Sequence, residues 1–161
     1  MDIDTKYDIS EIEEASRLFD NDLIRKTNML IDDVLELLED DQNKQDTFHK
    51  GIQIIKSKIK KDISFDELAK VIDGWEYTLS IIFDDYNILI HDNLKVAPYT
   101  SNLEFLFCIE VDKKKYTITK VYNLSEFSEI ERTSHIFFDI IMSIHRKIKS
   151  IKSSNKSCRQ W

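Results

Sequence analysis

The fold of this chain is decided by residues 75–122, which read WEYTLSIIFDDYNILIHDNLKVAPYTSNLEFLFCIEVDKKKYTITKVY. From Trp75 onward, apolar residues alternate with polar ones, and a period of two residues is typical of a strand with one buried face. We therefore predict a first strand over residues 75–83, with Trp75, Tyr77 and Phe83 on its buried face.

The same alternation predicts three further strands. Together the predicted strands cover residues 75–83, 86–90, 103–111 and 115–122. Asp84 and Asp85 suit a turn, because short Asx side chains bond nearby backbone groups, and residues 112–114 form a second polar turn. Short connections join antiparallel neighbours, so we predict a four-stranded antiparallel β-meander with helices on one face.

Helical periodicity surrounds this predicted sheet. The predicted helices cover about residues 10–40, 47–60 and 64–74, with a last one that starts within 124–128. Ser-x-x-Glu capping boxes begin at Ser10, Ser64 and Ser128, and Gly74 suits a helix end because glycine tolerates left-handed geometry. Whether the first helix is interrupted at residues 20–22 stays open, and residues 42–44 are predicted to be a linker.

These elements predict one α+β domain over residues 1–161, with N-terminal helices, the four-stranded meander and a long C-terminal helix. Residues 1–9 and 153–161 are expected to be loose termini. Two cysteines are too few for a disulfide framework, and the first residues lack the apolar run of a secretory signal. We therefore expect a cytoplasmic protein.

Charge is unevenly distributed along the chain, which carries a net charge of -7. The end of the first predicted helix is rich in acids: Asp32, Asp33, Glu36, Glu39, Asp40 and Asp41. Because carboxylates near a helix C-terminus oppose the helix dipole, this cluster favours a surface that attracts a basic partner. The alternative is a solvated helix face that keeps the protein soluble.

The opposite charge gathers near the C-terminus, at Arg146, Lys147, Lys149, Lys152, Lys156 and Arg159. Such a run is able to bind a phosphate backbone. It also complements the dipole at the end of a helix, and it is able to pack near the acidic first helix.

Residues with catalytic or metal-binding chemistry occur without a complete motif. Glu131, His135 and Asp139 share one helix face, but a second histidine four residues away is missing. Asp112 and Lys114 faintly resemble the carboxylate and lysine set of restriction-type nuclease folds, yet a hairpin turn explains Asp112 fully.

Two other kinds of site also lack support from the sequence. Cys108 and His91 have no evident third group to orient them as a nucleophile and base. Glycine-rich phosphate loops are excluded, because the chain has two glycines. We therefore predict no catalytic residue, no metal and no cofactor.

The sequence thus favours a non-enzymatic, acidic protein-binding module that inhibits a basic partner by occlusion, with tyrosines as anchors. In size, charge and α+β make-up it is similar to bacterial toxin-immunity proteins and phage anti-defence proteins. The predicted partner-binding residues are Asp32, Asp33, Glu36, Glu39, Asp40, Asp84, Asp85, Tyr86, Asp92 and Tyr99. The alternatives are a small nucleic-acid-binding regulator that uses the basic C-terminal helix and, third, a metal-dependent enzyme. A monomer and a homodimer are both compatible with the sequence.

Overall fold

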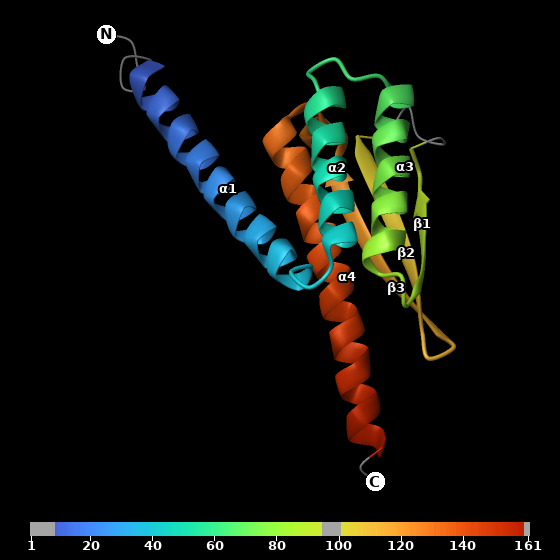
Figure 1. Ribbon diagram of the computed structural model, residues 1–161. Helices are drawn as coiled ribbons and strands as arrows, with labels where there is room; N and C mark the ends of the chain where they lie inside the picture. Colours follow the sequence, from blue (N-terminus) through green and yellow to red (C-terminus); the bar gives the residue numbers. More distant parts are fainter. Residues whose placement is uncertain (1–8, 95–100, 160–161) are drawn as a thin grey trace.

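The protein has an α+β fold with a three-stranded antiparallel sheet and a long C-terminal helix (Figure 1). The structure, a computed structural model, describes the backbone of residues 9–94 and 101–159 and the side chains of residues 22–94 and 101–154. In chain order the elements are α1 (Ile9–Leu37), α2 (Gln42–Lys58), α3 (Phe65–Ile82), β1 (Asn87–Asp92), β2 (Asn102–Val111), β3 (Lys114–Asn123), the 3-10 helix η2 (Leu124–Ser128) and α4 (Ile130–Arg159).

The predicted strand at residues 75–83 is wrong, because α3 continues through this segment to Ile82. Trp75, Leu79 and Ile82 are buried at the spacing of one helix face. Tyr77, predicted on the same buried face as Trp75, is 64% exposed. Within the residues that the structure describes, the sheet therefore has three strands and not four, and Gly74 lies inside a helix instead of ending one.

The start of α3 follows from its N-cap residue. Ser64 has an extended backbone, and its hydroxyl accepts a hydrogen bond from the Glu67 amide at 3.2 Å. The Glu67 carboxylate lies 3.5 Å from Lys60 Nζ and makes an ion pair with it. The N-cap predicted at Ser64 is thus confirmed, because the Ser64 hydroxyl accepts the hydrogen bond from the Glu67 amide.

The first two helices differ from expectation in their connection. α1 runs without interruption through residues 20–22, and residues 42–44 form the first turn of α2 instead of a linker. Asp41 caps this turn, because its carboxylate accepts a hydrogen bond from the Lys44 amide at 3.1 Å. The capping box predicted at Ser10 lies outside the side chains that the structure describes.

The three strands form a meander in the order β1-β2-β3. The predicted turn between β2 and β3 is confirmed, since Asp112 and Lys113 have positive φ angles of 52° and 69°, as the two-residue loop of a hairpin requires. In β2 every second side chain is buried, which confirms the predicted alternation: Leu103, Phe105, Phe107, Ile109 and Val111.

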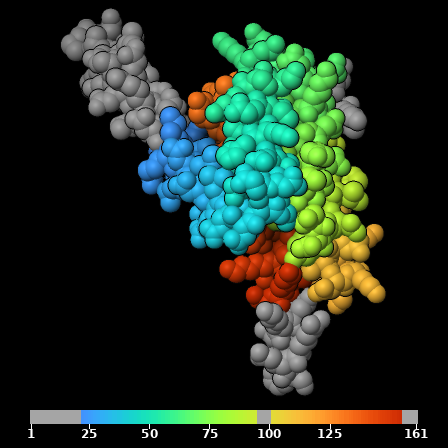
Figure 2. Space-filling view, viewed as in Figure 1, coloured from blue at the N-terminus to red at the C-terminus, as the bar shows by residue number. Residues whose placement is uncertain are grey.

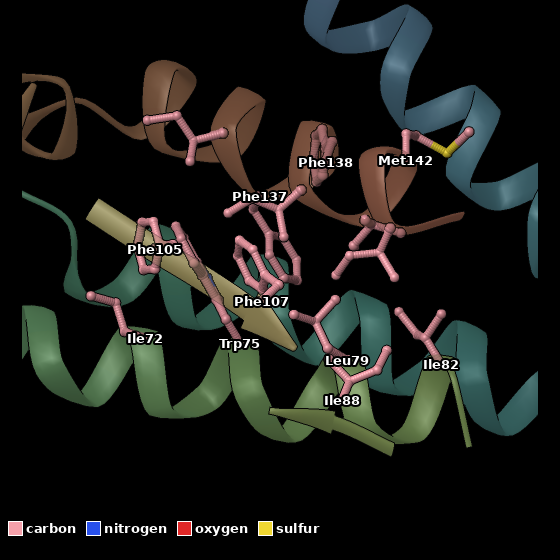
Figure 3. Close-up of a cluster of buried hydrophobic side chains, with 14 of the residues drawn as sticks. Ile72, Trp75, Leu79, Ile82, Ile88, Phe105, Phe107, Phe137, Phe138 and Met142 are labelled. Atoms are coloured by element: carbon pink, nitrogen blue, oxygen red, sulfur yellow. The ribbon is translucent and has the colours of Figure 1, made fainter. Parts of the chain in front are cut away.

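Trp75 of α3 lies at the centre of the hydrophobic core (Figure 3). Its ring centroid is 5.3 Å from that of Phe137 on α4, 6.3 Å from Phe105 on β2 and 6.1 Å from Phe127 on η2. α3, α4 and the inner face of the sheet therefore meet at one cluster of aromatic rings, each worth about 1.5–3 kcal/mol on burial.

α2 packs across α3 and α4 on the side of the helices away from the sheet (Figure 1). Phe48 of α2 stacks 5.9 Å from Phe137. Gly51 makes this approach close, since a Cβ atom there would lie 3.0 Å from Phe137 Cζ and 3.4 Å from Thr78 Oγ1. The helices thus form a second and a third layer over the sheet.

α4 begins later than predicted, because η2 occupies residues 124–128. Ser128, predicted as a capping residue, donates its hydroxyl to the Ser125 carbonyl at 2.7 Å. The helical backbone of α4 extends to Arg159, so the prediction of a loose terminus is wrong for residues 153–159. Within the described chain, every helix is too short or too polar to cross a lipid bilayer.

Candidate functional site

One face of α1 and of the turn that follows it carries five exposed carboxylates. They belong to Asp32, Asp33, Glu36, Glu39 and Asp40. At 3.6 residues per turn, Asp32, Asp33 and Glu36 span about 100° of the circumference of α1, and Glu39 and Asp40 follow in the turn after it. The opposite side buries Val34 and Leu38 in the core. Within the described residues, none of the five carboxylates makes an ion pair, and we call this surface the acidic face.

A cleft of about 550 Å³ lies at the end of the acidic face. The α1–α2 turn, the end of α3 and the second half of α4 enclose it, and Figure 2 shows these segments meeting where α4 emerges in red. Its floor is apolar and includes Leu38, Ile82, Phe83 and Ile148. Its polar lining residues are Asp40, Asp41, Lys44, Asp85, Tyr86, His145, Lys149, Lys152 and Ser153.

Two of the three lysines in the cleft are already engaged. Lys44 Nζ lies 3.0 Å from Asp84 Oδ1, and this ion pair connects α2 to the turn after α3. Lys152 Nζ lies over the Tyr86 ring, 5.1 Å from its centroid, as in a cation–π contact. Interaction of the ammonium with the Tyr86 hydroxyl raises the pKa of Lys152.

His145 of α4 connects the cleft to the acidic face. It lines the cleft and also a neighbouring groove of about 260 Å³ that Asp33 and Glu36 of α1 line from the other side. Partial burial lowers the pKa of the imidazole, and the positive charges of Lys149 and Arg146 lower it further. The lowered pKa favours the neutral imidazole, which carries no charge to balance Asp33 and Glu36.

The structure brings together most, but not all, of the predicted partner-binding residues. Asp40, Asp85 and Tyr86 line the cleft. Asp92 lies at the far end of β1, where its carboxylate accepts a hydrogen bond from the Leu94 amide at 3.1 Å. Tyr99 lies outside the described residues.

Glu131, His135 and Asp139 lie along one face of α4, and this face contacts two different elements of the fold. His135 Nδ1 lies 3.3 Å from the Thr27 hydroxyl of α1, and Asp139 pairs with Lys120 of β3. Because these side chains meet different elements, they do not converge on one ion. In the part of the chain that the structure describes, no group of three histidine, cysteine or acidic residues is arranged to hold a metal.

Of the other chemical candidates, Cys108 and His91 are neighbours on the sheet and line the same groove, whereas Asp112 has a structural role. Cys108 pairs in register with Leu89, and His91 pairs with Leu106, so the two lie diagonally on the outer face of the sheet. Asp112 occupies the β2–β3 turn.

Sequence reasoning missed the basic and apolar half of the cleft. Lys149 and Lys152 were considered for nucleic acid, and Lys44 was assigned to a linker, whereas all three line the same cleft as Asp40 and Asp85. The available signal was the complementary charge of α1 and α4, which made packing between them one of the alternatives.

Comparison with known proteins adds no relative. No protein-family model, curated protein or solved structure matches this chain.

Proposed function

We propose that this protein is a non-enzymatic binding protein that engages a basic protein partner through its acidic face and inhibits it by occlusion. The observation that carries the proposal is the group of five exposed carboxylates, which have no ion pair among the described residues. A carboxylate near the C-terminal end of a helix opposes the helix dipole, an interaction of about 0.3–1 kcal/mol for each charge. A cationic surface that binds the acidic face would offset this unfavourable interaction.

Electrostatic steering is the expected mechanism of association. A concentrated negative field attracts a basic surface before contact and raises the association rate, and salt screens this effect. Tyr86, half-buried at the cleft, is suited to be one of the desolvated anchors that hold the complex once it has formed. A partner whose functional cleft is basic would be covered and thereby inhibited.

The position of the lysines favours a protein partner over nucleic acid. Lys149 and Lys152 lie in a cleft that Asp40 and Asp85 also line. A phosphate backbone approaching these lysines would meet the two carboxylates as well. Nucleic-acid binding by α4 is therefore kept as an outcome of the test.

The test compares two variants of equal net charge in capture experiments from a lysate of the source cell. Asp32→Lys, Asp33→Lys and Glu36→Lys together reverse the acidic face. The matched control reverses three exposed acids elsewhere, Asp62→Lys, Asp73→Lys and Glu76→Lys. Capture is carried out at low and at moderate salt, with mass spectrometry and a nucleic-acid assay of the eluate.

We expect wild type and the control to retain one stoichiometric basic protein whose binding weakens with salt, and the reversed face to lose it. With purified partner, the reversed face should slow association by about tenfold or more. Equal retention by both variants would contradict the proposal. Recovery of nucleic acid in place of a protein would indicate that α4, and not the acidic face, is the binding surface.

A further inference from the structure

The cleft combines an apolar floor with unpaired negative charge at its edge. Leu38, Ile82 and Ile148 contribute to the floor from three different helices. A volume of about 550 Å³ is within the range of about 300–1,000 Å³ typical of ligand-binding pockets. An apolar group of a partner would therefore find a preformed place to bury itself.

The charge at the edge of the cleft that has no ion pair is negative by a margin of one. Lys44 is paired with Asp84, whereas Lys149 has no ion pair and Lys152 lies over the neutral Tyr86 ring. Among the described residues, Asp40, Asp41 and Asp85 make no ion pair, so three carboxylates face two ammonium groups. A cationic group of the partner, next to its apolar group, would thus be able to form an ion pair with a carboxylate at the edge of the cleft.

The cleft is continuous with the acidic face. Leu37 and His145 line both the cleft and the groove that contains Asp33 and Glu36. A ligand that extends from the cleft into this groove would therefore reach the carboxylates of α1. This continuity favours a protein segment as the occupant.

We propose that the cleft receives an apolar side chain from a segment of the basic partner, while a neighbouring arginine or lysine of that segment pairs with Asp40 and Asp85. This inference rests on the proposed function and specifies the chemistry of the partner at the contact. The partner segment is amphipathic and basic, and its apolar side chain is the anchor, because desolvated anchors carry most of the binding free energy of an interface.

Three fluorescein-labelled synthetic peptides test this proposal. The first places leucine at helical spacing among arginines, the second replaces each arginine by glutamate, and the third replaces each leucine by serine. Fluorescence anisotropy measures their dissociation constants with the full-length protein. The first peptide should bind at least about tenfold more tightly than the other two, a difference of about 1.4 kcal/mol.

Two substitutions at neighbouring positions of α4 locate the binding. Ser153→Trp places a large ring in the cleft, whereas Ser154→Trp places the same ring on an exposed position that does not line it. We expect Ser153→Trp to weaken the first peptide by about tenfold or more and Ser154→Trp to leave it unchanged. Asp40→Asn with Asp85→Asn, which preserves side-chain shape, should weaken the first peptide without improving the serine peptide.

Each contrary result has a distinct meaning. If the first peptide binds Ser153→Trp as well as wild type but fails on the Asp32→Lys, Asp33→Lys, Glu36→Lys protein, the cleft proposal is wrong and the acidic face remains the binding surface. Preference for the glutamate peptide would overturn the chemistry assigned to the edge. Failure of every peptide on wild type would also overturn the cleft proposal, while the lysate capture still decides the proposed function separately.

Discussion

Lys120 of β3 and Asp139 of α4 form an ion pair between the sheet and the last helix, with Nζ 3.3 Å from Oδ2. Tyr122 donates a hydrogen bond to the same carboxylate oxygen at 3.4 Å. Asp139 is the acid that interrupts the apolar stretch 136–144, and its partners explain why Lys120 shares a strand face with apolar residues. Both side chains of the pair are about 30% exposed, so the pair is only partly shielded from water.

A double-mutant cycle should detect this ion pair. Lys120→Met, Asp139→Asn and the double variant are compared by urea unfolding, and we expect a coupling free energy of about 0.5–1 kcal/mol. The exposed pair Asp22–Lys26 of α1 is the control, because its coupling should vanish in high salt while the inner pair keeps part of its coupling. A coupling of zero at low salt would show that the Lys120–Asp139 contact does not stabilise the fold.

Tyr122 should make the protein less stable in alkali. Burial raises the pKa of the phenol, and the negative charge of Asp139 raises it further. The unfolded chain therefore loses the phenolic proton first, so the stabilisation is complete below the ordinary value of 10.0 and falls as the pH rises past it. Tyr122→Phe should reduce this alkaline loss of unfolding free energy in urea titrations, whereas Tyr77→Phe, on an exposed ring, should not. Equal pH slopes for wild type and Tyr122→Phe would contradict the assignment.

The sheet was predictable where one strand face is apolar and the other polar. β2 and β3 alternate over ten residues each, and their turn residues tolerate positive φ, so periodicity and turn chemistry agree. The segment 75–83 failed because its residues satisfy both periods. Trp75 and Leu79 fit one helix face as well as they fit an alternating pattern, whereas Ile82 fits the helix face alone, and tertiary packing decided in favour of the helix.

The candidate site was predictable in its charges but not in its shape. The acids of α1 are adjacent in sequence, so their common face follows from helical spacing alone. The cleft depends on Leu38, Ile82 and Ile148 meeting at the ends of three helices. Periodicity along one helix carries no information about which helix ends lie together, so this meeting depends on the packing around Trp75.

His145 should make the protein less stable in weak acid. The pKa of this imidazole is lowered in the fold, first by burial and then by Lys149 and Arg146. Below the ordinary value of 6.5 the unfolded chain binds more protons than the folded one, so the free energy of unfolding falls as the pH falls through that value. His145→Gln should flatten this dependence between about pH 7 and pH 5. His49→Gln, at an exposed position on α2, is the control and should leave the slope as in wild type.

The same substitution at the two glycines should have opposite effects on stability. Both lie inside helices, where alanine is favoured over glycine by about 1 kcal/mol. At Gly74 the new Cβ would lie 3.4 Å from Ile54 Cδ1, an ordinary contact with the flexible end of a side chain, so Gly74→Ala should stabilise the protein by roughly 0.5–1 kcal/mol. At Gly51 the new Cβ would lie 3.0 Å from Phe137 Cζ.

The ring of Phe137 has no room to retreat from that Cβ, because it is fully buried and stacks 5.3 Å from Trp75. Gly51→Ala should therefore lower the free energy of unfolding in urea by about 1–3 kcal/mol, despite the gain in helix propensity. Phe137→Leu removes part of the ring, so it should reduce the cost of Gly51→Ala in the double variant, whereas it should not change the effect of Gly74→Ala. Stabilisation by both alanines would mean that α2 does not cross α4 at the close distance that the core geometry requires.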